Sequence, residues 1–314
     1  MIEVTNLTKK YGDHIAVDHL SFRVEKGQIY GFLGPNGAGK STTMNIITGY
    51  LAATEGTVTI DGKDVQKDPE EAKCAIGYLP ELPPLYVDMT VREYLDFVAE
   101  LKKVPKKERK QQIDEVMEMT QITDMQQRLI RNLSKGYRQR VGLAQAILGY
   151  PEVIILDEPT VGLDPKQIIE IRDLIRKLGE NHTVILSSHI LSEVSAVCDH
   201  IMIIAHGKLV ASDSPENLQK LMSGSMELDL EVKGSIAAVK SALQEISQID
   251  RIEENTEASK NIAKLKVISK ENADIREQVF YALADAKLPI LEMTHAEKSL
   301  EDIFLELTQE IKPN

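Results

Sequence analysis

The chain has 314 residues, 42% of them hydrophobic, and a formal net charge of −12. Its length allows a full core and suggests two domains, and its acidity argues against nucleic acid as a partner, because nucleic-acid-binding proteins usually present a basic surface. No apolar run reaches the roughly 18 residues of a membrane span, and Cys74 and Cys198 show no C-x-x-C or metal-ligand spacing, so both are expected to be buried thiols.

Short β-rich runs alternate with helical segments over about residues 1–221, which is typical of an α/β domain. Residues 28–33 are predicted to form a buried strand that leads into a glycine-rich loop. Between about residues 83 and 132 the strands vanish and apolar residues recur at spacings of three and four, so a helical subdomain is predicted there. Two more strands, both with β-branched residues, are expected at residues 153–156 and 184–186.

The pattern of the chain changes near its last third. Apolar and acidic residues alternate over residues 226–232, as in a half-exposed strand. Helical stripes and alternating strands then follow in the order β-α-β-β-α-β, with a last helix around residues 303–307. We therefore predict a first domain of residues 1–222, a hinge at residues 223–225, and a small ferredoxin-like α+β domain of residues 226–314 with an accessory or regulatory role.

Residues 34–41, Gly-Pro-Asn-Gly-Ala-Gly-Lys-Ser, fill every fixed position of the phosphate-binding pattern G-x-x-x-x-G-K-[ST]. The glycines let the backbone curl so that N–H groups point at phosphate oxygens, and the helix that follows adds the positive end of its dipole. Lys40 supplies a point charge for the β- and γ-phosphates, and the Ser41 hydroxyl can ligate Mg²⁺. The expected nucleotide contacts are Asn36, Gly37, Ala38, Gly39, Lys40, Ser41 and Thr42.

Two carboxylates end the strand predicted at residues 153–156. Asp157 can hold a magnesium ion or its water, and Glu158 follows directly, where it can orient or deprotonate an attacking water. Paired acids at a strand end can also cap a helix, and the Pro159-Thr160 that follows would suit that reading. The accompanying phosphate loop favours the catalytic interpretation.

Three later motifs resemble those of one ATPase family. Leu-Ser-Lys-Gly-Tyr-Arg-Gln-Arg at 133–140, Gly-Leu-Asp-Pro at 162–165 and Ser-Ser-His at 187–189 have the order and spacing of the ATP-binding cassette (ABC) family, which the chain resembles over about residues 1–221. The resemblance implies a P-loop NTPase fold of the α/β class, ATP and Mg²⁺ as ligands, and ATP hydrolysis as the reaction. It also implies that two copies meet head to tail with two ATP molecules between them.

Within one copy, the resemblance gives three further residues a role. Tyr11 would stack on the adenine, and Val17 would pack beside it. His189 would contact the γ-phosphate and hold the geometry of the transition state.

Between copies, the resemblance implies that Ser134 and Gly136 face the ATP held by the partner. The N–H groups at a glycine-containing helix start suit phosphate oxygens that one loop leaves exposed. Asp164 would bridge the two copies.

Several positions depart from the usual family pattern. Glu81 stands where Gln is usual; a carboxylate can still contact Mg²⁺, although it adds negative charge beside the phosphates. Lys135 and Tyr137 replace the common Gly and Gln of the signature, and Val161 replaces a Ser. These departures, together with Ser-Leu-Glu-Asp-Ile-Phe at residues 299–304, resemble the ABC-2-type export subfamily of gliding-motility, copper-enzyme-maturation and drug-resistance systems.

The favoured hypothesis is therefore the ATPase subunit of an exporter, a homodimer at the cytoplasmic face of the membrane that docks on separate transmembrane permease subunits. A soluble ABC ATPase acting on ribosomes or DNA is the alternative. Ribosome-acting members usually carry two cassettes and DNA-repair members a long coiled-coil insertion, neither of which this chain has. An unrelated P-loop kinase or GTPase is a third possibility, but the N-K-x-D motif of GTPases is absent from the sequence.

Overall fold

The structure is a computed structural model that describes residues 1–222, 226–254, 261–270 and 273–296. The described chain forms two compact units, one made of residues 1–215 and one that begins at Glu216. The hinge predicted at residues 223–225 and the last helix predicted around residues 303–307 lie outside the described residues, as does the motif at 299–304.

The N-terminal unit contains a mixed sheet of six strands. All neighbouring strands are parallel except the edge pair β10 and β9. Strands β3, β7 and β8 are buried along their whole length, as expected for parallel strands covered on both faces. The order across the sheet is β10 (Lys208–Asp213), β9 (His200–Ala205), β3 (Ile29–Leu33), β8 (Thr183–Ser188), β7 (Val153–Asp157) and β6 (Ile76–Leu79).

A second sheet of four antiparallel strands packs on the same core. Helix α1 (Lys40–Ile47) lies between the two sheets, because its Met44, Ile46 and Ile47 share one buried cluster with side chains of β1 and β4 and of β7 and β8. The loop that precedes α1 is therefore held on a rigid framework. The strand order of this sheet is β2 (His14–Val24), β1 (Ile2–Tyr11), β4 (Glu55–Ile60) and β5 (Lys63–Asp64).

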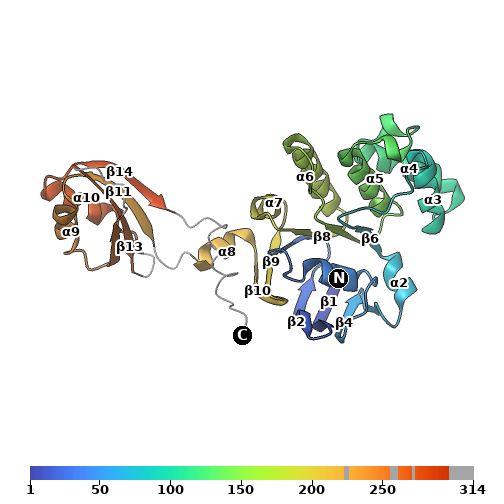
Figure 1. The fold of residues 1–314 in the computed structure, drawn as a ribbon, viewed down its shortest axis with the longest axis horizontal. Coiled ribbons are helices and arrows are strands. Elements are labelled where there is room, and N and C mark those ends of the chain that lie inside the picture. The colour runs from blue at the N-terminus through green and yellow to red at the C-terminus, as the bar shows by residue number, and fades with distance from the viewer. Residues whose placement is uncertain (223–225, 255–260, 271–272, 297–314) are drawn as a thin grey trace. The chain divides into compact units, whose positions relative to one another are not determined.

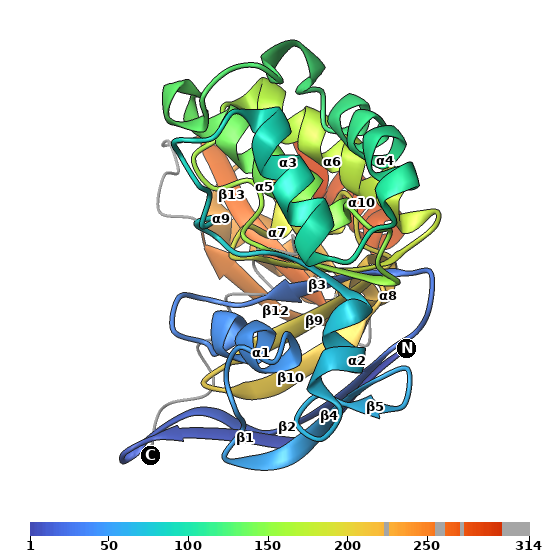
Figure 2. The ribbon, with the colours of Figure 1, turned by 90° about the vertical axis from the view of Figure 1, so that its right-hand side faces the viewer.

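The segment predicted to be helical contains α3 (Val91–Leu101) and α4 (Lys106–Met119), followed by two short 3₁₀ turns. Helix α5 (Lys135–Ile147) packs against both, and the three lie together on the far side of the six-stranded sheet from β1 and β2 (Figures 1 and 2). None of the helices in the described ranges combines the length and apolarity needed to cross a membrane. The remaining helices of this unit are α2 (Pro69–Cys74), α6 (Pro165–Gly179) and α7 (Leu191–Ser195), and α8 (Pro215–Met222) follows at the boundary between the units.

The prediction that both cysteines are buried is wrong for one of them. Cys198 is buried, whereas Cys74 is exposed. Cys74 is the last residue of α2, a helix of six residues in which only Ala72 is buried. So short a helix covers the core with a single residue, and the apolar neighbours of Cys74 in the sequence do not bring its thiol inside.

The C-terminal unit follows the predicted order of elements over its described part. Its four strands are antiparallel, in the order β12-β13-β11-β14. Leu228, Leu230 and Val232 alternate along β11 and pack with residues of α9 and α10 in one buried cluster, so the two helices cover one face of the sheet. The elements are β11 (Glu227–Lys233), α9 (Ile236–Leu243), β12 (Ile249–Glu254), β13 (Ile262–Ser269), α10 (Arg276–Asp285) and β14 (Ile290–Ala296).

Candidate functional site

The glycine-rich loop connects β3 to α1 and has the backbone that its glycines predict. Gly37 and Gly39 have φ values of 81° and 104°, a region that favours glycine. A Cβ on Gly39 would lie 2.5 Å from the carbonyl oxygen of Ala16, so a larger residue has no room there. Lys40 begins α1 with only 6% of its surface exposed, and its Nζ donates to the carbonyl of Gly34 at 2.7 Å. The loop therefore encloses a nearly buried ammonium group.

Asp157 and Glu158 lie beside this loop, at the end of β7. The Oδ1 of Asp157 accepts hydrogen bonds from the hydroxyls of Ser41 at 3.3 Å and Ser187 at 2.5 Å. The Ser187 hydroxyl also accepts from the backbone N–H of Glu158 at 3.0 Å. Glu158 has a φ of 48°, which is uncommon for a residue with a side chain. Ser187, to which the sequence analysis gave no role of its own, thus holds both acidic residues in place.

The Glu158 carboxylate lies between two groups that can carry positive charge. Its Oε1 is 3.7 Å from Lys40 Nζ and its Oε2 is 3.0 Å from His189 Nδ1. Burial lowers the pKa of Lys40 below its ordinary value, while Glu158, Asp157 and Glu81 act in the opposite direction. A cation that has lost its water in this way interacts strongly with any anion brought next to it.

These residues surround one cavity of about 410 Å³. Tyr11 lies at its edge with 49% of its surface exposed; the Nζ of Lys9 lies over one face of the ring, 5.2 Å from its centre, which leaves the other face for stacking. Val17, which is predicted to pack beside the adenine, is fully buried and is not among the residues that line the cavity. Its neighbour Ala16 lines the cavity, together with His14. The other lining residues are Asn36, Gly37, Ala38, Gly39, Lys40, Ser41, Thr42, Glu81, Glu158, Val161 and His189.

The residues expected to hold a metal ion carry oxygen ligands of the kind that Mg²⁺ prefers. Ser41 is hydrogen-bonded to Asp157, and Glu81 lines the same cavity. Over the described residues, no group of three or more His, Cys, Asp or Glu side chains is placed to hold a metal. Mg²⁺ is commonly bound by one or two carboxylates with phosphate oxygens and waters, which matches a hydroxyl and a carboxylate beside a phosphate-binding loop.

Ser134, Gly136 and Asp164 do not line this cavity. Ser134 is the N-cap of α5, and its hydroxyl accepts from the N–H of Tyr137 at 3.4 Å. Asp164 is the N-cap of α6 in a capping box with Gln167. A Cβ on Gly136 would lie 2.7 Å from the Oε1 of Gln167, so the two helix starts pack tightly against each other. Within one chain these residues lie at the starts of two packed helices and are not among the residues that line the cavity.

Comparison with known proteins gives a consistent picture. Residues 17–161 match a family model described as ABC transporter. The chain is 42% identical over 232 residues to the bacitracin transport ATP-binding protein BcrA of Bacillus licheniformis, spanning 73% of this chain and 75% of that protein. It is 32% identical over 313 residues to the linearmycin resistance ATP-binding protein LnrL of Bacillus subtilis (strain 168), spanning 98% of each. A dimeric structure of the bacterial ABC transporter cassette MJ0796 matches with a TM-score of 0.63 and 28% identity, over 68% of this chain and 98% of that one.

Proposed function

This chain belongs to the ABC transporter family of ATPases, and we propose from that premise that two copies close head to tail over two ATP molecules to drive an exporter. Binding and hydrolysis of ATP are the activities of the family. The observation that carries the proposal is the division of the N-terminal unit into two regions. One holds Lys40, Glu158 and His189 around a cavity, and the other presents the starts of α5 and α6.

Hydrolysis assigns a separate task to each side chain of the cavity. Lys40 stabilises negative charge on the β- and γ-phosphates from a nearly buried position. Glu158 accepts a proton from the attacking water, and His189 holds one of its carboxylate oxygens at 3.0 Å. Asp157 and Ser41 would hold Mg²⁺, which would supply further positive charge at the phosphates. Ser134 and Gly136 of the second copy then cover the phosphate oxygens that the loop leaves open.

The exporter part of the proposal rests on the relatives and on one exposed apolar surface. BcrA and LnrL are named for bacitracin transport and linearmycin resistance, which supports the export of antibiotic-like compounds. Leu82, Tyr86 and Val87, between β6 and α3, are 76%, 57% and 41% exposed. A large contiguous apolar patch marks a protein contact, and we propose that these three side chains, which lie close together in the sequence, belong to the docking point of a transmembrane permease subunit. The chain thus works at the cytoplasmic face of the membrane.

Action on ribosomes or DNA finds no support in these observations. The relatives above are named for transport or for resistance to a small molecule, and a net charge of −12 does not favour a nucleic-acid surface. A membrane pull-down with the full chain separates the two functions, because an exporter subunit recovers a transmembrane protein and a ribosomal factor recovers ribosomal RNA.

The substitution Glu158→Gln tests the closed dimer. It removes the proton acceptor and keeps the size of the side chain, so hydrolysis should fall by about a hundredfold or more while ATP stays bound. Size-exclusion chromatography with light scattering should then show a dimer that depends on ATP and Mg²⁺.

Glu180→Gln, at an exposed carboxylate beyond the end of α6, is the matched control and should behave as the wild type. A Glu158→Gln variant that binds ATP yet stays monomeric with Mg²⁺ would contradict the head-to-tail arrangement.

A further inference from the structure

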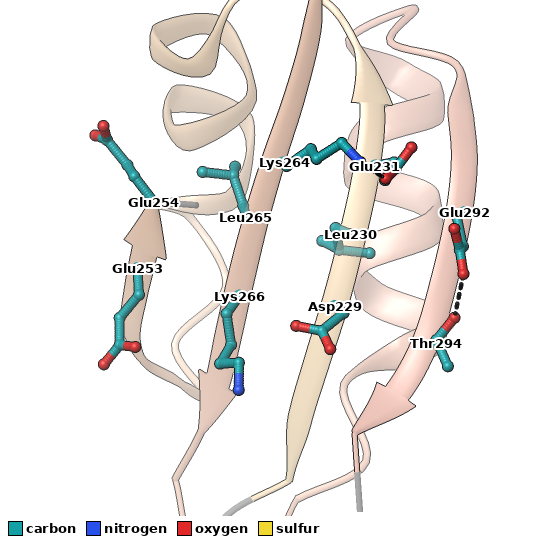
Figure 3. Close-up of a pocket in the computed structure, with 10 residues that line it drawn as sticks. All are labelled: Asp229, Leu230, Glu231, Glu253, Glu254, Lys264, Leu265, Lys266, Glu292 and Thr294. Carbon is teal, nitrogen blue, oxygen red and sulfur yellow. Dashed lines mark hydrogen bonds and ion pairs between the residues drawn. The ribbon is translucent and has the colours of Figure 1, made fainter. Parts of the chain in front are cut away.

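The sheet of the C-terminal unit has a second face that α9 and α10 do not cover. Residues of β11 alternate between the helix-covered core and this open face, where Asp229 is exposed and Glu231 is partly exposed. The neighbouring strand β13 places Lys264 and Lys266 on the same face (Figure 3). A shallow groove of about 590 Å³ runs along it. Charged side chains of the two central strands thus line the groove, together with Glu253 and Glu254 of β12 and Glu292 of β14.

The charges on this face are sorted by strand. In the antiparallel register, Asp229 lies opposite Lys266 and Glu231 lies opposite Lys264. An acidic column on β11 therefore runs beside a basic column on β13. Ion pairs hold the columns in place: Lys264 with Glu231, and Lys266 with Glu227 at 2.9 Å. The hydrogen bond from Lys266 to Glu227 raises the pKa of this lysine, so Lys266 keeps its charge at neutral pH.

The position of these columns in the sheet makes the face complementary to itself. The strand order is β12-β13-β11-β14, so the boundary between the β13 and β11 columns lies in the middle of the sheet. A twofold axis parallel to the strands, placed over that boundary, sets β13 of one copy across from β11 of the other. The same axis leaves the height of each residue along the strands unchanged. Lys266 of each copy therefore faces Asp229 of the other, and Lys264 of each copy faces Glu231 of the other. Two twisted sheets packed face to face keep their strands within about 30° of each other, which permits this alignment.

The outer strands are compatible with the same arrangement. The axis sets β12 of one copy across from β14 of the other. Glu253 pairs with Lys266 and Thr294 pairs with Asp229, so the two residues lie at the same height along the strands and face each other. Glu292 lies at the level of Glu231 and Lys264, one step beyond Glu254, which is the last described residue of β12. Among the paired residues of these described strands, no two like charges face each other.

We propose that the occupant of this face is the same face of a second copy, in an isologous pair held by the β11 and β13 charge columns. A twofold interface uses one surface twice, and alternating opposite charges are what such a surface needs. A purely acidic ligand fits less well, because five carboxylates and only two lysines line the groove. This pairing keeps two nucleotide-binding units near each other when ATP is absent and raises their effective concentration.

Two charge-reversed variants of the full chain test the pairing without nucleotide, so the result does not depend on the proposed function. Asp229→Lys with Glu231→Lys makes both columns basic, and Lys264→Glu with Lys266→Glu makes both acidic. Each variant alone should fail to pair, because like charges then face each other. An equimolar mixture restores opposite charges at all four facing positions, so its dissociation constant should be lower than that of either variant alone by about tenfold or more.

The measurement is sedimentation velocity at low ionic strength, where the wild type should dimerise and where added salt should separate it. Circular dichroism checks that each variant is folded. Damage to the fold cannot explain association that appears only on mixing. A wild type that stays monomeric at low salt, or a mixture that associates no better than its parts, overturns the proposal and leaves the face to another part of the chain or to another protein.

Discussion

Ser187→Ala isolates the contribution of one buried hydroxyl to the fold and to catalysis. Ser187 is fully buried in β8. It donates to the Asp157 carboxylate at 2.5 Å and accepts from the backbone N–H of Glu158 at 3.0 Å. Alanine removes both bonds and leaves that N–H without this partner in a place that water does not readily reach. Glu158, whose N–H loses this partner, has a φ of 48°. A residue with a side chain keeps such a backbone conformation only when the surrounding structure holds it.

The expected cost follows from these two bonds. A hydrogen bond to a charged group contributes about 1.5–3 kcal/mol, and a buried donor left unpaired costs about 1–3 kcal/mol. We expect Ser187→Ala to lower the free energy of unfolding by about 3 kcal/mol. Ser21→Ala is the matched control, because the exposed Ser21 hydroxyl accepts from the N–H of Asn6 at 2.8 Å and donates to its side chain at 3.4 Å. Asn6 also has a φ of 48°. Water can replace those bonds, so the control should cost less than about 0.5 kcal/mol.

Urea unfolding followed by circular dichroism measures both free energies, and an ATPase assay measures the effect on catalysis. In Ser187→Ala the backbone of Glu158 is no longer fixed, so kcat should fall by about tenfold to a hundredfold. KM for ATP should change little, because the hydrogen bonds of Lys40 to the loop are intact. Equal losses of stability in the two serine variants, or a change in KM with kcat preserved, would refute this reasoning.

Three more outcomes are expected. With a thiol reagent at about pH 8, only Cys74 of the native chain should react, because burial raises the pKa of the Cys198 thiol; both should react in urea. Thr90→Ala removes the capping box with Glu93 at the start of α3 and should lower the free energy of unfolding by about 1 kcal/mol in the same urea assay. Chelation of Mg²⁺ should abolish hydrolysis, and Ser41→Ala should raise the Mg²⁺ concentration needed for half-maximal rate, measured by titration.

The sequence predicts the loop and its helix well because their geometry is local. Glycines at 37 and 39 supply the positive φ values, and Lys40 follows them directly. Val17 shows where such reasoning stops. The register of the β1–β2 pairing shifts on both sides of Lys9, the residue that pairs with Val17. A shift of one residue exchanges the two faces of a strand, so Ala16 reaches the cavity and Val17 faces the core. No local motif records that shift.

The order of strands across the sheet explains why these motifs form one site. Along the chain the strands come as β3, β6, β7 and β8, whereas across the sheet β8 lies between β3 and β7. Leu33, just before the loop, pairs with Ser188, and Asp157 pairs with Ser187. The parallel strands end at one edge, where such sheets bind their ligands, so the segment that carries Ser187 and His189 lies between the phosphate loop and the two carboxylates. β8 lies between β3 and β7 although it follows both along the chain. Ser187, two residues before His189, can therefore hold both acidic residues, Asp157 and Glu158.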